Sequence, residues 1–328
     1  MVTKAAVDAM GGDHAPAEVV AGALAWAADN SENQVFLVGK QEVIEAEITS
    51  IKEAGQLACS REQIVIVNAN EVIGCDESPA TALRRKKDAS IVVASALVRE
   101  GKADAVVSCG STGAQMAAAI FILGRMEGID RPPIVTALPG EGGHRTMLID
   151  VGANVDCKPA QLLQFALLGS AYARSVMGIA SPRVGLLNNG TEETKGNALA
   201  QQVHVLLKEQ EGINFIGNVE GRDLFSPIAD IVVCDGFTGN ILLKALEGLG
   251  LYFASSIMKE VEKSPAILES FDYSRIGGAP LLGVNAISIV CHGSSRREAV
   301  ANGLRIAEEC VRNGMVARQA EELAKCKL

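Results

Sequence analysis

Short apolar runs rich in Val, Ile and Ala alternate along the chain with longer stretches in which apolar residues recur every three to four positions. The short runs have the length and β-branched content of buried strands, and the longer stretches have the period of helices. Expected strands cover Lys4–Asp8, Gln34–Val38, Gln63–Val67, Ala103–Ser108, Pro133–Leu138, Met147–Val151, Arg183–Leu187, Asn214–Gly217, Ile231–Asp235 and Ala286–Cys291. Expected helices cover Ala17–Ala28, Pro79–Glu100, Gly113–Gly124, Pro159–Met177, Lys195–Leu207, Gly239–Lys263 and Ser295–Asn313. Strands that alternate with helices predict an α/β fold with a mostly parallel, Rossmann-like sheet.

Composition sets the broad class of the protein. The 328 residues are 48% hydrophobic and 21% charged, which is typical of a globular protein with a large core. This length allows one large domain over 1–328 or two lobes, with a short helical hairpin over 255–275 and a tail over 317–328 that is a polar helix or a frayed end. A net charge of −9 argues against nucleic acid as a partner of the whole chain.

Cysteine usage and the first residues indicate the compartment. The 8 cysteines include no CxxC pair and fit no zinc-ligand spacing, so we expect reduced thiols and no metal site. The chain enters a strand almost at once, and we therefore expect no signal peptide and a cytoplasmic protein. Two uncharged runs, 105–124 and 276–295, are interrupted by Gly and polar residues, which favours buried strands over membrane spans.

Four turns rich in Gly, Ser, Thr and Asn each follow an expected strand and precede an expected helix. They lie at residues 10–13, 108–113, 188–193 and 235–240. Because the carboxyl ends of parallel strands share one edge of a sheet, we expect all four turns at that edge. Helix N-termini favour a nearby anion by about 0.3–1 kcal/mol each, so the pattern predicts a phosphate site. No Walker A or complete GxGxxG pattern occurs, which favours phosphate or a small phosphorylated species over a nucleotide.

The first of these turns has a specific string of residues, AVDAMGGDHAP over Ala6–Pro16. An apolar strand ends at Asp8, and Gly11 and Gly12 leave the backbone bare. Further strings with distinct character are VSCGSTGA (107–114), GIDRP (128–132), IDVGANVD (149–156), SPRVGLLNNGTEETKGN (181–197), NFIGNVE (214–220), DGFTGNIL (235–242) and HGSS (292–295).

On these strings, which run from the first strand to the last long helix, the chain resembles the phosphate acyltransferases of bacterial phospholipid synthesis, the PlsX family. The resemblance implies a three-layer fold related to isocitrate and isopropylmalate dehydrogenases, and a homodimer. It implies the reaction of acyl-[acyl-carrier protein] with inorganic phosphate to give acyl phosphate and free carrier protein. The acyl phosphate would feed a downstream glycerol-3-phosphate acyltransferase. No metal, nucleotide or other cofactor is implied.

Two departures from the family pattern bear on these expectations. Family members usually read Ser-Ala-Gly-Asn-Thr-Gly where this chain has SCGSTG over 108–113, so Ser111 keeps a hydroxyl but lacks an amide donor. The stretch 257–275 is shorter than the helical hairpin that several relatives carry and that is associated with membrane contact. Peripheral contact with the inner face of the membrane therefore stays open.

The reaction needs phosphate held against a thioester carbonyl, a stabilised oxyanion and a leaving thiolate. Phosphate is itself a usable nucleophile, so positioning and charge stabilisation carry the rate. Lys195 is the first catalytic candidate, as a point charge on phosphate or oxyanion, or else a solvated lysine paired with a nearby Glu. Asn240 donates to the carbonyl oxygen or caps a helix. His14 protonates the thiolate or fixes its loop beside a capping Asp13.

The remaining candidates line the same turns. Expected phosphate or substrate contacts come from Asp8, Gly11, Gly12, Asp13, Gly110, Ser111, Thr112, Gly113, Asp235, Gly239 and His292. Of these, Asp235 is expected to orient its turn, and His292 either joins the site or caps a helix. In the string IDVGANVD, Asn154 and Asp156 are expected to be turn-making residues.

The sharpest charge feature is the run Arg84, Arg85, Lys86 and Lys87. It suits docking of an acidic carrier protein or anionic lipid, or it is a solvated helix face.

Three other functions stay open. A short-chain phosphotransacetylase would act on acyl-CoA instead of a carrier-protein thioester. An NAD- and metal-dependent dehydrogenase would need a carboxylate cluster that the sequence does not clearly provide. A non-enzymatic scaffold at the membrane would use the basic run to recruit partners.

Overall fold

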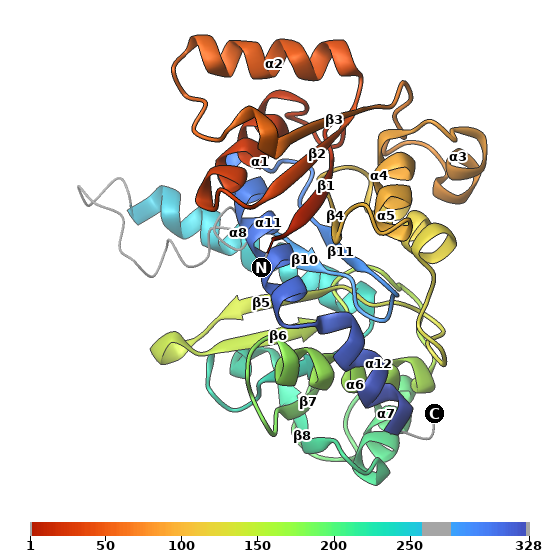
Figure 1. The fold of residues 1–328 in the computed structure, drawn as a ribbon. Coiled ribbons are helices and arrows are strands. Elements are labelled where there is room, and N and C mark those ends of the chain that lie inside the picture. Colours follow the sequence, from red (N-terminus) through yellow and green to blue (C-terminus); the bar gives the residue numbers. More distant parts are fainter. Residues whose placement is uncertain (1, 258–276, 326–328) are drawn as a thin grey trace. The chain divides into compact units, whose positions relative to one another are not determined.

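The computed structural model describes residues 2–257 and 277–325, and the chain divides into two compact units (Figure 1). Unit 1 comprises Met1–Arg125 and Ser274–Asn313, and unit 2 comprises Met126–Tyr273 and Gly314–Leu328. Most of the expected hairpin over 255–275 lies outside the described residues.

Unit 1 is built on a six-stranded sheet in the order β10-β11-β4-β1-β2-β3, parallel except where β10 pairs with β11. Its strands are β1 (Lys4–Asp8), β2 (Gln34–Gly39), β3 (Ile64–Asn68), β4 (Ala105–Ser108), β10 (Ala279–Pro280) and β11 (Ile287–Val290). Its helices are α1 (Ala17–Asp29), α2 (Gln41–Glu53), α3 (Pro79–Arg85), α4 (Ser90–Arg99), α5 (Thr112–Ala118) and α11 (Arg297–Arg312). The helices α1 and α11 pack together, and a Cβ at Gly22 would lie 2.5 Å from the Arg297 carbonyl oxygen.

Unit 2 is built on a five-stranded sheet in the order β5-β6-β9-β7-β8, in which only the β5–β6 pair is antiparallel. Its strands are β5 (Val135–Pro139), β6 (Arg145–Ile149), β7 (Arg183–Asn188), β8 (Asn214–Glu220) and β9 (Ile231–Val233). Its helices are α6 (Pro159–Ser175), α7 (Ala198–Glu209), α8 (Gly236–Ile257) and α12 (Met315–Lys325). The core is aliphatic, and Phe165, Leu168 and Ile231 are fully buried in it.

The expected α/β class with mostly parallel strands is confirmed, but the expectation of one sheet edge for all four turns is wrong. Strands β1 and β4 belong to the sheet of unit 1, whereas β7 and β9 belong to the sheet of unit 2. Two turns therefore follow strands of each sheet. The local sequence identifies a strand, but it does not specify which distant strand becomes its neighbour.

The expected helix over Pro79–Glu100 is broken into α3 and α4. Lys86 leaves the helical conformation, and its ammonium binds the Val72 carbonyl oxygen at 2.7 Å and Glu77 Oε1 at 2.6 Å. Next to it, Ala89 forms an isolated bridge with Glu71. These tertiary contacts outweigh the helical propensity of the segment.

Two elements were not expected, and the tail contains a helix, α12. The sequence predicts no helix over 41–53, where α2 buries only Ile44, and no strand at β10. In the tail, α12 packs on α6 with Met315 and Leu323 buried. In the part of the chain that is described, no helix combines the length and apolarity that a membrane crossing requires.

Candidate functional site

In unit 1, the ends of β1 and β4 are joined by a buried carboxylate. Asp8 is only 4% exposed, and Ser108 donates from its hydroxyl to Asp8 Oδ2 at 2.8 Å. The same hydroxyl accepts the Gly110 N–H at 3.0 Å. Burial raises the pKa of Asp8, although hydrogen bonds from Ser90 and Ser108 oppose that shift. The structure thus places Asp8 as the link between two predicted turns.

The glycines of these turns permit a very close approach of backbone to backbone. A Cβ at Gly11 would lie 2.6 Å from Asp8 Oδ2 and 2.8 Å from the Gly110 nitrogen. Gly12 has a φ of +107°, and its Cβ would lie 2.9 Å from that of Cys109. Steric clash therefore accounts for both glycines whether or not an anion binds there.

The loop after β11 completes this cluster of turns, because Asp13 donates its backbone N–H to the Gly293 carbonyl oxygen at 2.8 Å. His292 binds Ser294, whose hydroxyl lies 2.7 Å from His292 Nδ1. The interpretation of His292 as a helix cap is wrong, because α11 begins at Arg297 and its N-cap is Arg296.

Helix caps in this cluster also differ from expectation. The N-cap of α1 is Pro16 without a side-chain bond, so the exposed Asp13 is not the cap. His14 is half-buried, and its carbonyl oxygen accepts the Glu18 N–H at 3.1 Å. Ser111 does cap α5, because its hydroxyl accepts the Ala114 N–H at 3.3 Å. The Ser111 hydroxyl thus has a local structural role at the start of α5.

Thr112 and Gly113 open α5, directly after this cap. Thr112 is exposed, and a Cβ at Gly113 would lie 2.6 Å from Pro79 Cγ, so this glycine also marks a close approach.

The basic run divides into two kinds of side chain. Arg84, Arg85 and Lys87 are exposed, whereas Lys86 is half-buried and engaged with Val72 and Glu77. Three of the four charges are therefore presented to solvent.

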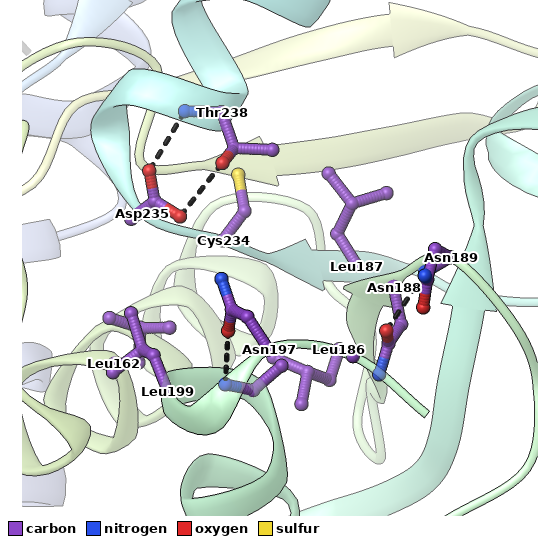
Figure 2. A pocket seen from close by; sticks show the side chains of 12 residues that line it. Leu162, Leu186, Leu187, Asn188, Asn189, Asn197, Leu199, Cys234, Asp235 and Thr238 are labelled. Carbon is purple, nitrogen blue, oxygen red and sulfur yellow. Dashed lines mark hydrogen bonds between the residues drawn. The ribbon is translucent and has the colours of Figure 1, made fainter. Parts of the chain in front are cut away.

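In unit 2, a pocket of about 380 Å³ opens at the carboxyl ends of the neighbouring strands β7 and β9 (Figure 2). Figure 2 shows Cys234, Asp235 and Thr238 on one side of it, and Asn197 and Leu199 on the other. The lining also includes Leu162, Leu186, Leu187, Asn188, Asn189, Gly196 and Ala200. The N-terminal ends of α6, α7 and α8 thus meet around one cavity at a sheet edge, where ligands of α/β proteins bind.

The loop that carries Lys195 borders this pocket. Asn188 donates from Nδ2 to the Lys195 carbonyl oxygen at 3.3 Å, and Lys195 donates its N–H to the Glu192 carbonyl oxygen at 3.1 Å. The Lys195 stem packs over Gly190, where a Cβ would lie 2.8 Å from Lys195 Cγ. Lys195 is exposed and precedes α7, which begins at Ala198 with Asn197 as N-cap.

The interpretation of Lys195 as the partner of a nearby Glu is wrong for the described residues. Glu193 pairs instead with Lys208 at 2.7 Å, and Lys195 forms no ion pair within the described part of the chain. A lysine whose backbone is held in a bonded loop and whose ammonium is uncommitted is available to an anionic substrate.

The start of α8 is positioned by an exceptionally close contact with the loop after β6. A Cβ at Gly239 would lie 2.0 Å from the Asp150 carbonyl oxygen, and one at Gly236 would lie 2.6 Å from that of Asn154. Gly236 also donates its N–H to the Asn154 carbonyl oxygen at 2.8 Å. Both glycines are therefore required by packing.

Asp235 caps α8. This role agrees with the expectation that Asp235 orients its turn. Its Oδ1 accepts the Thr238 N–H and its Oδ2 accepts the Thr238 hydroxyl, both at 2.8 Å. The alternative reading of Asn240 as a cap is wrong, since Asn240 lies four residues inside a helix that begins at Gly236. Its exposed side chain lies close to Gly152, where a Cβ would be 3.4 Å from Asn240 Oδ1.

A buried carboxylate that was not expected holds the loop after β6. Asp150 is fully buried and accepts the N–H groups of Ile134 at 2.9 Å and Asn154 at 2.7 Å. Burial raises the pKa of Asp150, although these hydrogen bonds act to lower it. Asn154 makes the turn by donating from Nδ2 to the Pro132 carbonyl oxygen at 3.0 Å. Asp150 follows an apolar run just as Asp8 does, and this shared pattern could have identified Asp150 from the sequence.

Sequence reasoning also missed the thiol and leucines of the pocket. Cys234 is 3% exposed and donates to the Asp150 carbonyl oxygen at 3.5 Å, and burial raises its pKa well above the usual range. Leu187 and Leu199 lie on either side of the polar string NNGTEETKGN. Because they are apolar, the sequence alone would place both leucines in the core.

Among the described residues, no group of three or more His, Cys, Asp and Glu side chains is arranged to hold a metal ion. The seven described cysteines form no disulfide.

Comparison with known proteins relates the whole chain to one family. The family model described as "Fatty acid synthesis protein" matches residues 3–318. A phosphate acyltransferase from Syntrophomonas wolfei is 60% identical over 320 residues, which cover 98% of each chain. A phosphate acyltransferase from Desulforamulus reducens is 51% identical over 337 residues, covering 99% of this chain and 98% of the relative.

Solved structures show the same fold at much lower identity. The EutD phosphotransacetylase from Staphylococcus aureus has a TM-score of 0.60 at 19% identity, covering 97% of this chain and 94% of its own. A 4-hydroxythreonine-4-phosphate dehydrogenase from Klebsiella pneumoniae has a TM-score of 0.56 at 14% identity, covering 94% and 98%. These likenesses agree with the expected Rossmann-like, three-layer α/β fold.

Proposed function

The chain belongs to the phosphate acyltransferases, and from this premise we propose that it transfers an acyl group from an acyl carrier protein thioester to inorganic phosphate. A phosphate oxygen forms a bond to the carbonyl carbon, the carbon–sulfur bond breaks, and the phosphate proton passes to the leaving sulfur. The products are acyl phosphate and free carrier thiol. The acyl phosphate then supplies glycerol-3-phosphate acylation in phospholipid synthesis.

The observation that carries this proposal is the uncommitted ammonium of Lys195 on a bonded loop beside the pocket of unit 2. A point charge there stabilises phosphate or the negative charge that develops on the thioester oxygen. The hydrogen-bonded loop supports this role, because its bonds hold the Lys195 backbone beside the pocket and a positioned charge is more effective in catalysis.

We assign Asn240 the role of a neutral donor to the thioester carbonyl oxygen. Its exposed amide stands on the second turn of α8, which is fixed by the glycine contacts with Asp150 and Asn154. Since Asp235 already caps the helix, capping does not account for an amide at position 240.

Direct attack by phosphate is favoured over a covalent acyl-enzyme. The pocket thiol, Cys234, is kept protonated by burial, and the thiol nearest to it along the site, Cys157, has its pKa raised to about 11 by burial. Cys109 is buried in unit 1 at the base of its turn. A thiol in such surroundings is a poor nucleophile.

For unit 1 we propose that Gly12, Gly110, Ser111, Thr112 and Gly113 contact phosphate through the backbone and hydroxyl groups of their turns. Neighbouring residues then have supporting roles. Asp8 and Gly11 hold the turns together, Asp13 and His292 tie in the loop after β11, and His14 relays the phosphate proton to the leaving thiolate. In unit 2, Gly239 supports the site by packing.

The proposed partners follow from the exposed surface. Arg84, Arg85 and Lys87 form the basic surface that we assign to an acidic carrier protein, in a cytoplasmic enzyme. The apolar side chains of Leu251 and Tyr252 on α8 are more than 60% exposed, which supports a homodimer or peripheral membrane contact.

Purified protein incubated with phosphate and a matched pair of palmitoyl thioesters, one on carrier protein and one on CoA, tests the proposal. Hydroxylamine traps the acyl phosphate as a hydroxamate. We expect hydroxamate from the carrier-protein thioester at a kcat/KM well above that for CoA. Turnover of the CoA thioester alone would assign the chain to the phosphotransacetylase reaction instead.

A further inference from the structure

The pocket of unit 2 is unsuited to an anion. Its twelve lining residues include no Lys or Arg, and Asp235 is the only one with a charge. Both Asp235 oxygens are occupied by Thr238. A phosphate placed inside would therefore meet a carboxylate and no cation. The chemistry of the lining favours an uncharged guest.

Most polar lining groups are already engaged in local turns. Asn188 uses its oxygen for the Asn189 N–H at 2.8 Å and its amide nitrogen for the Lys195 carbonyl oxygen. Asn197 uses its oxygen for the Ala200 N–H at 2.9 Å. An arm with several amide groups would find few partners among these atoms, because both Asn188 groups and the Asn197 oxygen are already bonded.

The apolar side chains form the rest of the surface. Leu162 and Leu186 are buried beneath the pocket, and Leu187 and Leu199 are half-buried and leave apolar surface uncovered. Figure 2 shows Leu187 and Leu199 on different sides of the opening, with the Cys234 thiol directed toward the start of α8. A hydrocarbon covers such a surface favourably, because each CH₂ removed from water strengthens binding.

We propose that this pocket holds the acyl chain of the substrate, with the methylenes beyond the first few seated on Leu187 and Leu199. The proposal rests on the proposed function, which supplies a hydrocarbon and places its reacting carbonyl near Lys195. Lys195 directly precedes the lining residues Gly196 and Asn197, so a chain that enters past these residues and extends to Leu199 leaves its head group at the loop. A volume of about 380 Å³ is in the range of small-molecule sites.

The variant Leu199→Trp narrows the pocket, and Leu187→Phe is a second variant on a strand, where an aromatic side chain is well tolerated. Val205→Trp is the matched control, since Val205 stands 52% exposed on α7, outside the lining. Phosphorolysis is measured with C4, C8, C12 and C16 carrier-protein thioesters. We expect Leu199→Trp to lower kcat/KM at least tenfold for C12 and C16 and less than twofold for C4. An equal loss at every chain length, or no loss in either variant, overturns the proposal.

Calorimetric binding of dodecylphosphonate and butylphosphonate, below their micelle concentrations, separates failure of this proposal from failure of the proposed function. Burial contributes about fourfold in affinity per methylene, so wild-type protein should bind the dodecyl compound at least tenfold more tightly. Leu199→Trp should bring the ratio close to one, and Val205→Trp should not. An unchanged ratio in Leu199→Trp, or no chain preference in wild type, contradicts the proposal even if the enzyme turns over. The expected ratios without turnover would support the chain site and refute the proposed function.

Discussion

The side-chain amide of Asn188 donates to the backbone carbonyl oxygen of Lys195 at 3.3 Å, tying the last residue of β7 to the loop seven residues later. Directly after Lys195, Gly196 adopts a φ of +94°, and a Cβ there would lie 2.6 Å from Asn188 Oδ1. The sequence NNGTEETKGN therefore encodes a closed loop in which the backbone of its lysine is held by hydrogen bonds.

Replacement of this lysine should reduce catalysis without unfolding the protein. Lys195→Ala removes an exposed ammonium with no ion pair in the described chain, so we expect kcat/KM for phosphorolysis to fall on the order of 100-fold. Lys208→Ala is the control, because Lys208 neutralises Glu193 of the same loop on the surface. Comparable activity of the two variants would remove Lys195 from the site.

A second substitution separates catalysis from helix capping on α8. Asn240→Ala should lower kcat by about 10²–10³ and leave the thermal midpoint unchanged, since alanine suits a helix interior. Asp235→Ala removes the cap and should cost about 0.5–2 kcal/mol of unfolding free energy. Loss of stability in Asn240→Ala with little change in kcat would reverse these assignments. Chemical denaturation and steady-state kinetics provide both readouts.

Two glycines of α8 differ sharply in their surroundings. A Cβ at Gly239 would lie 2.0 Å from the Asp150 carbonyl oxygen, whereas one at Gly248 meets nothing within 4 Å. Gly239→Ala should destabilise unit 2 by about 1–3 kcal/mol through overpacking. Gly248→Ala should stabilise the helix by up to about 1 kcal/mol. Equal midpoints in urea for both variants would contradict the close contact.

Opposite pH dependences are expected from two carboxyl groups. Burial raises the pKa of Asp8, so above about pH 3.9 the folded state holds more protons there than the unfolded state, and stability falls as pH rises towards the folded pKa. Burial also raises the pKa of Asp230, but hydrogen bonds from Arg183 outweigh it and the net pKa is lowered. The stabilisation from Asp230 is therefore present above about pH 3.9 and is lost as pH falls.

Unfolding of Asp8→Asn and Asp230→Asn, followed between pH 3 and pH 7, measures these contributions. Relative to wild type, Asp8→Asn should gain stability as pH rises, and Asp230→Asn should lose it. Differences that stay constant over this range, or that have the same sign in both variants, would refute the assigned shifts.

The sequence was sufficient to locate most elements, because their signal is local. The strand Lys4–Asp8 and the start of α1 at Ala17 fall where the apolar pattern places them. The pattern failed where distant contacts decide. Lys86 leaves its helix to bind Val72 and Glu77, and no local feature indicates that.

The candidate site shows the same division between local and distant causes. Gly, Asn and Asp residues after apolar runs correctly indicate turns between strands and helices. Asp235 caps its helix, as the preference of Asp for the N-cap position predicts. Gly239 and Asp150, which are in close contact, are 89 residues apart in the sequence. Cys234 and Leu199 border one pocket because β7 pairs with β9. Sequence spacing carries no information on such pairings.

Release of carrier thiol from palmitoyl carrier protein, with and without inorganic phosphate, tests most directly whether phosphate itself attacks the thioester. Thiol is followed in the first turnover at enzyme concentrations close to those of substrate. We expect no thiol release without phosphate, and one acyl phosphate for each thiol when phosphate is present. A phosphate-independent burst of about one thiol per enzyme would show an acyl-enzyme, and no phosphate-stimulated release would refute the activity.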